Sequence, residues 1–211
     1  MEELGIVLKS FYPYKYKLSV LAQHSGKLNV MINPTPLASQ FAPGTLVRFF
    51  THEGMQSTVI PQVEILNIPV FTMSEHIYWL HHLLEICYYF LPLGLGSEEL
   101  FQLVQYAFEL SDHDELFKPY FRLVKKVCLT RVMISFGFYP TEQLSYVIKL
   151  FEEVVMVSLD SSNAQKVRLL QRSFKSVTKT MEKEIDTWLL SCVHDHPQAA
   201  QFKTLSFFHS M

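Results

Sequence analysis

The chain has 211 residues, of which 49% are hydrophobic and 18% are charged, and its formal net charge is -2. This composition excludes a mainly disordered chain, and the length suits one large domain or two modest ones. Because the net charge is slightly negative, no global positive field attracts polyanions, so any nucleic-acid site has to be local.

The cysteines and the apolar segments indicate a cytoplasmic protein without a membrane partner. Cys87, Cys128 and Cys192 lie far apart, and such an odd, unpaired set is typical of a reducing cytosol. The acidic start of the chain is unlike a secretory signal. The most apolar segment, residues 86–93, is broken by Pro92 well short of the ~20 residues that a membrane-spanning helix needs.

Up to about residue 70 the sequence alternates between apolar and polar residues and is rich in β-branched and aromatic side chains, which predicts strands. Gly26 supplies the turn between the second and third strands, and Pro34 and Pro36 end the third. Five strands are predicted, over residues 4–11, 17–24, 27–33, 45–52 and 57–66.

After residue 70 the apolar spacing changes to three and four, which predicts helices. Glu98 and Glu99 lie in the first turn of the second helix, where the helix dipole favours acids, and Gly137 ends the third. About five helices are predicted, over residues 72–91, 97–111, 112–136 with a bend at Pro119, 141–157 and 163–192.

These elements predict an α+β fold with an oligonucleotide/oligosaccharide-binding (OB)-like barrel over residues 1–70 and a helical domain over residues 71–211. An SH3-like barrel, or a small sheet packed on helices, fits the same pattern.

Several short motifs resemble the bacterial recombination mediator RecO. They are Gly5-Ile6-Val7-Leu8-Lys9, Lys17-Leu18-Ser19-Val20-Leu21, Ser25-Gly26-Lys27-Leu28 and, after a long helix, Phe136-Gly137-Phe138-Tyr139-Pro140. The resemblance implies an OB domain followed by helices, with no enzymatic activity. It also implies binding to single- and double-stranded DNA, a RecR-like partner, and contact with the acidic tail of the single-stranded-DNA-binding protein.

The sequence departs from that family at two places. Family members usually carry a basic loop after the third strand, whereas residues 32–39 here contain neither lysine nor arginine. Many members also place zinc-binding cysteines after the last motif, whereas residues 141–144 contain none, so we expect no metal or other cofactor. The neutral loop leaves open an alternative, a protein-interaction adaptor that has lost DNA binding.

The fifth predicted helix carries the clearest positive charge. Five of its basic residues follow spacings of four, three, four and four, which keeps them on one face beside a buried apolar stripe. Five cations on one face suit a phosphate backbone, and an ordinary solvated face is the competing interpretation. These residues are Arg168, Arg172, Lys175, Lys179 and Lys183.

Other candidate DNA contacts lie on the barrel and near the end of the third helix. The barrel candidates alternate with aromatic residues, as in proteins that bind single strands, although they also suit a solubilised edge strand. The barrel set is Lys9, Lys15, Lys17, Lys27 and Arg48, and the third-helix set is Lys125 and Lys126, with Arg131 beside them.

Nothing in the sequence predicts catalysis or metal binding. His81 with Glu85, and His194 with His196, do not supply three converging ligands. We therefore predict a non-enzymatic, RecO-like repair and recombination mediator, which binds DNA non-specifically and helps load the strand-exchange protein on single-stranded DNA.

Overall fold

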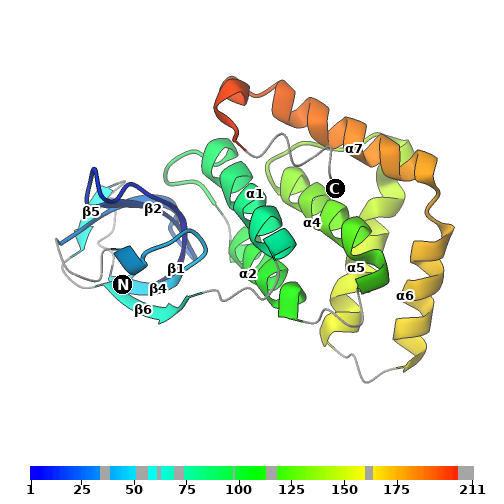
Figure 1. Ribbon diagram of the computed structural model, residues 1–211, viewed down its shortest axis with the longest axis horizontal. Coiled ribbons are helices and arrows are strands. Elements are labelled where there is room, and N and C mark those ends of the chain that lie inside the picture. The colour runs from blue at the N-terminus through cyan, green and yellow to red at the C-terminus, as the bar shows by residue number, and fades with distance from the viewer. Residues whose placement is uncertain are drawn as a thin grey trace. The chain divides into compact units, whose positions relative to one another are not determined.

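The computed structural model describes residues 1–33, 39–50, 57–60, 63–68, 74–96, 98–112, 118–159 and 164–203. Strands come first and helices follow, so the predicted α+β fold is confirmed (Figure 1). The strands are β1 (Glu2–Ser10), β2 (Lys17–Ala22), β3 (Gly26–Ile32), β4 (Leu46–Phe50), β5 (Ser57–Ile60) and β6 (Val63–Asn67). The helices are α1 (Ser74–Phe90), α2 (Glu98–Asp112), α4 (Phe121–Ser135), α5 (Ser145–Leu159), α6 (Ala164–Ser176) and α7 (Lys179–His194).

The strands form one sheet in the order β5-β3-β2-β1-β4-β6. All pairs are antiparallel except β3 with β5. The predicted fifth strand is therefore two strands, which pair with opposite edges of the sheet. Because the three residue steps from Ile60 to Val63 reach at most ~11 Å, the sheet has to curl until its edges approach each other. The strand order is OB-like. The sheet is open, because no described residues pair β5 with β6.

Apolar side chains fill both faces of the central strands. Alternate residues of β1 to β4 point to the inside of the curl and form its core, which includes Val7, Leu18, Val20, Val30, Val47 and Phe49. On the other face of β1, Ile6 and Leu8 are also buried, and α1 packs against this strand. The sheet therefore depends on α1 as well as on its own core.

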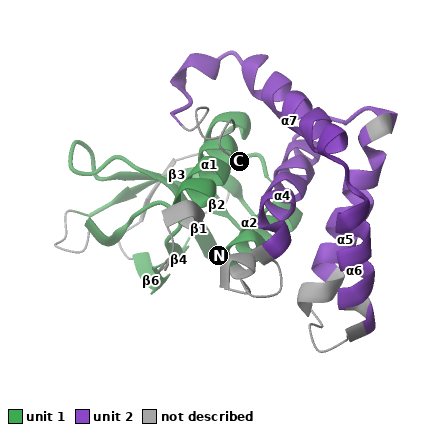
Figure 2. Cartoon of the chain, turned by 45° about the vertical axis from the view of Figure 1, so that its right-hand side comes forward, with its two compact units in different colours: residues 1–108 green, residues 109–211 purple. Residues whose placement is uncertain are grey.

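The chain divides into two compact units, residues 1–108 and 109–211 (Figure 2). The first unit thus extends beyond the barrel boundary predicted near residue 70, because α1 and the loop after it belong with the sheet. The β2–β3 hairpin docks on this loop by two backbone hydrogen bonds. Lys27 N donates to the Leu95 carbonyl at 2.9 Å, and Gly94 N donates to the Lys27 carbonyl at 2.8 Å.

Gly26 makes this docking sterically feasible. Its φ of +69° favours glycine, and a Cβ at this position would overlap the backbone carbonyl of Leu95. Gly94 has a similar φ of +73°, but a Cβ there would meet no atom within 4 Å. The two glycines therefore share one backbone constraint and differ in packing.

We predict that Gly26→Ala lowers the free energy of unfolding by about 2–4 kcal/mol, because backbone strain and overpacking add. The matched control Gly94→Ala carries the strain alone and should cost about 1 kcal/mol. Urea denaturation of both variants measures the difference. Equal losses of unfolding free energy would show that a side chain at position 26 does not clash with the backbone of Leu95.

In the second unit α4 packs against α5 and α7, and α6 packs against α5. The prediction of a single helix over residues 163–192 is wrong, because Val177 and Thr178 separate α6 from α7. Thr178 adopts an extended N-cap conformation, and its hydroxyl accepts a hydrogen bond from Met181 N at 3.3 Å. Two adjacent β-branched residues, the second of which supplies the capping hydroxyl, favour a new helix start over continuation.

The third predicted helix is also shorter than expected. A 3-10 turn at Lys118–Tyr120 precedes α4, which starts at Phe121, and residues 113–117 lie outside the described part. Its end follows the prediction. Gly137, at a φ of +89°, donates to the Ile134 carbonyl at 2.9 Å, and Phe138 N donates to the Met133 carbonyl.

A buried lysine connects α4 to α7. Lys126 is 1% exposed, and its ammonium group lies 2.7 Å from a Glu182 carboxylate oxygen and 2.8 Å from an Asp186 oxygen. Moving an ammonium out of water costs several kcal/mol, so this position requires both carboxylates.

We predict that the double variant Glu182→Gln, Asp186→Asn loses about 3–5 kcal/mol of unfolding free energy, because it leaves Lys126 buried without a countercharge. Glu184→Gln removes an exposed carboxylate from the same helix and should change the value by less than about 0.5 kcal/mol. Thermal and urea unfolding test both. A double variant as stable as the control would contradict the role of the ion pairs.

Candidate nucleic-acid interface

Five exposed basic residues lie on α6 and α7, and we call them the α6–α7 cations: Arg168, Arg172, Lys175, Lys179 and Lys183. The first three lie within an arc of about 60° on α6, at 100° per residue. No acidic residue occurs in α6. Within the described part of the chain, none of the five forms an ion pair.

The break at residues 177–178 changes the predicted geometry of this set. The cations do not follow one straight helix but form a group of three on α6 and a pair in the first turns of α7. Lys175 and Lys179 lie on either side of the break, and four residues of chain reach at most ~14 Å. The two groups therefore meet at the junction between the helices.

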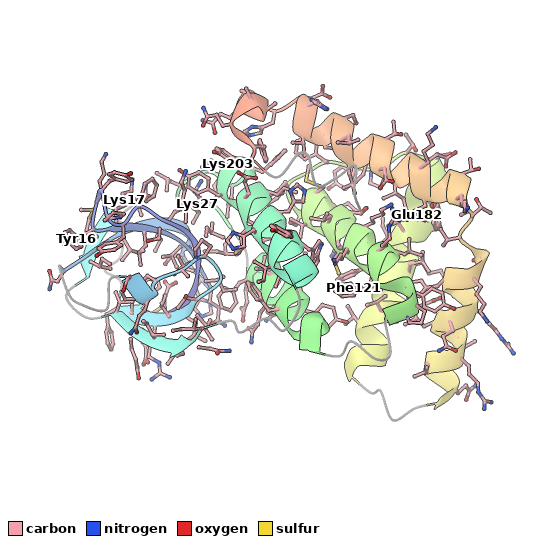
Figure 3. All side chains as sticks on the ribbon, in the orientation of Figure 1. Tyr16, Lys17, Lys27, Phe121, Glu182 and Lys203 are labelled. Carbon is pink, nitrogen blue, oxygen red and sulfur yellow. The ribbon has the colours of Figure 1, made fainter. Side chains whose placement is uncertain are left out.

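The acids of α7 do little to neutralise these cations. Glu182 and Asp186 turn toward the buried Lys126, and Figure 3 labels Glu182. Glu184 alone stays exposed among the acids of the first two turns. The outward side of the junction thus keeps an excess of positive charge that the sequence spacing alone does not reveal.

The structure removes Lys125 and Lys126 from the predicted DNA contacts. Lys126 is buried in its ion pairs. Lys125 is 6% exposed, and its ammonium lies 4.2 Å from the centre of the Phe121 ring. Both residues stabilise the helical unit from inside, because their long apolar stems suit a buried face.

Arg48 on β4 is also engaged within the sheet. Its guanidinium lies 3.1 Å from a carboxylate oxygen of Glu2 on β1 and 3.3 Å from one of Glu64 on β6. These side chains form a cross-strand ladder with two acids around one base. A phosphate would meet net negative charge at this position.

Lys27 caps the C-terminal end of α1. Its ammonium donates to the carbonyls of Tyr88 and Leu91, the latter at 2.8 Å, and lies 4.6 Å from the Tyr88 ring centre. A cation suits the negative end of a helix. Burial, with smaller effects from the charges of Lys17 and Lys9, lowers the pKa of Lys27 to about 8. The "Ser-Gly-Lys" motif therefore holds the β2–β3 hairpin against α1 and the loop after it, and this structural role engages the Lys27 ammonium.

Lys9 and Lys17 gather with Lys27 around aromatic rings. Lys9 lies 5.2 Å from the Phe11 ring centre and 4.5 Å from that of Tyr88, and Lys17 lies 5.1 Å from Phe11. Rings attract cations without neutralising them. The sequence does not predict that the Tyr88 ring lies near these lysines, because Tyr88 is some eighty positions away from Lys9 and belongs to an apolar helix segment.

The loop between β1 and β2, residues 11–16, exposes three tyrosines and one lysine, and we call it the tyrosine loop. Tyr14 is 93% exposed, and Tyr12 and Tyr16 are partly so, with ring centres 6.0 Å apart. Lys15 is exposed beside them. Figure 3 shows Tyr16, Lys17 and Lys27 on the sheet unit. Exposed rings next to cations are the elements with which proteins hold single strands.

The described residues contain no cluster of three or more histidine, cysteine or acidic side chains suited to a metal ion. Residues 141–144 offer no thiol for a zinc site. Burial raises the pKa of Cys87 and Cys128 to about 12, so both thiols stay protonated and unreactive at neutral pH.

No protein-family model matches the chain, and no curated protein matches it. Among the described helices, none combines the length and apolar character that crossing a membrane requires.

Lys27 gives a testable pH dependence. Between pH 8 and pH 10.5 the unfolded chain holds a proton on Lys27 that the folded chain has lost. This group therefore makes the unfolding free energy rise with pH across that window. Relative to Lys27→Met, the wild type should gain stability from pH 8 to pH 10, as urea midpoints will show. A constant difference between the two proteins would contradict the lowered pKa.

Proposed function

We propose that the chain is a non-enzymatic DNA-binding mediator of the RecO kind, which holds DNA through its phosphates and helps load the strand-exchange protein on single-stranded DNA. The observation that carries this proposal is the set of α6–α7 cations, which are exposed and have no ion pair within the described residues. The order of an OB-like sheet followed by helices supports it.

Binding would be non-specific, because arginine and lysine on a smooth helix face contact phosphates and do not read bases. Five phosphate contacts give a slope of about -4 in a plot of log affinity against log salt concentration. The tyrosine loop with Lys9, Lys15 and Lys17 adds a second surface, on the sheet unit. A RecR-like protein and the tail of the single-strand binder are the protein partners of this proposal.

We predict that Arg168→Glu, Arg172→Glu lowers affinity for a labelled oligonucleotide at least tenfold at about 50 mM salt and reduces the slope by about 2, since each lost phosphate contact removes ~0.9. Fluorescence anisotropy with single-stranded and duplex DNA measures both. The control Arg122→Glu, Lys149→Glu makes the same change of net charge at exposed positions on two other helices, α4 and α5.

Undetectable binding at about 50 mM salt, or equal losses in the two double variants, would contradict the DNA proposal. The mediator role needs a separate measurement, the rate at which a strand-exchange protein coats DNA already covered by the single-strand binder. The wild type should raise this rate, and the Arg168→Glu, Arg172→Glu variant should not.

An adaptor without DNA binding is the second candidate, and one observation favours it. Lys27, Arg48, Lys125 and Lys126 are all engaged in internal contacts, so the available positive surface is smaller than the sequence predicts. The same titrations decide between the two, because an adaptor would show no affinity for either form of DNA at low salt.

A further inference from the structure

A hollow of about 390 Å³ lies in the helical unit between α7 and the turn before α5. Trp188 is half-buried in it, and Leu144 adds apolar surface. The remaining lining residues are polar in type, although most of the surface that faces the hollow is apolar: Thr141, Thr180, Lys183, Glu184, Thr187 and Ser191.

The chemistry of this lining suits a flat, polar-edged ring. The indole of Trp188 offers an aromatic face, and stacking on such a face holds any nucleobase. The Thr187 and Ser191 hydroxyls donate to the backbone carbonyls of Lys183 and Trp188, so they offer a ligand their acceptor lone pairs, as the Glu184 carboxylate does. The amino groups on the edge of a base can donate to these acceptors, which an apolar peptide side chain cannot do.

The hollow continues the α6–α7 cations. On α7, Thr180, Glu184, Thr187 and Ser191 follow spacings of four, three and four, so they share one face of the helix. Lys183 lies at about 40° on the same helix wheel, between Lys179 at 0° and this face at about 110°. Lys183 thus belongs both to the cationic surface and to the wall of the hollow.

We propose that this hollow binds one unpaired nucleobase of a single strand whose phosphates follow the α6–α7 cations. The inference rests on the proposed DNA binding and adds the strand type that the helical unit selects. Glu184 repels phosphate, so the backbone stays at Lys179 and Lys183 while the base enters. Bases of a duplex remain stacked on their neighbours and reach the hollow only at the cost of unstacking.

The two tryptophans make the test direct, because Trp79 is buried in the first unit at 3% exposure and Trp188 is accessible. In the variant Trp79→Phe the remaining fluorescence comes from Trp188. A single strand of about 15 nucleotides should quench it. An abasic strand of the same length and a duplex should bind with little quenching.

Affinity variants provide an independent readout. Trp188→Ala should weaken binding of the single strand about tenfold, within the range of base stacking, and leave the abasic strand and the duplex unchanged. Trp188→Phe keeps an aromatic face and should retain most of the affinity. If Trp79→Phe fails to fold, the quenching lost between wild type and Trp188→Phe gives the same signal.

Single-strand binding without quenching, or equal quenching by the abasic strand, would overturn the base site and leave the phosphate surface standing. If neither single strand nor duplex binds, the proposed function fails and the base site fails with it. A Trp188→Ala variant that weakens duplex and single strand equally would also overturn the inference.

Discussion

The buried ammonium of Lys126 constrains the charge of the whole helical unit. At 1% exposure it needs countercharges, and α7 supplies both Glu182 and Asp186. With those carboxylates turned inward, α7 presents Lys179 and Lys183 outward beside α6, which has no acid. Because Lys126 engages these two carboxylates, they are not available to pair with Lys179 and Lys183 on the neighbouring sector of α7. The positive surface arises from a protein whose formal net charge is -2.

Some basic residues of this chain pair with groups of the chain itself, and others stay exposed without such a partner among the described residues. The local sequence does not distinguish the two kinds. Lys27 caps a helix, Arg48 connects three strands, and Lys126 lies in the core. Arg168 and Arg172 have no such partner within the described residues. A cation near an acceptor of its own chain is held by that acceptor, so the positive charge available to a ligand is what remains after internal pairing.

The features predicted correctly are those that a few neighbouring residues determine. The turn at Gly26, the acids that open α2 and the stop at Gly137 are local, and each was read from the sequence. The parallel pair of β3 with β5 and the burial of Lys126 depend on distant segments, which periodicity does not reveal. The break at Thr178 had a local signal, its capping hydroxyl, but the apolar spacing on either side concealed it.

Under the proposed function, the two candidate surfaces would bind DNA by different physical means. The α6–α7 cations would attract phosphates through charge. Salt screens this attraction beyond about 10 Å at 0.1 M, so the affinity falls as the salt concentration rises. The tyrosine loop exposes three rings next to Lys15, and stacking of a base on a ring neutralises no phosphate, so this part of the affinity depends less on salt. In this proposal the tyrosine loop keeps its share of the affinity at salt concentrations at which the α6–α7 cations lose theirs. A stepwise loss of contacts would suit the proposed mediator, which has to pass its strand to a second protein.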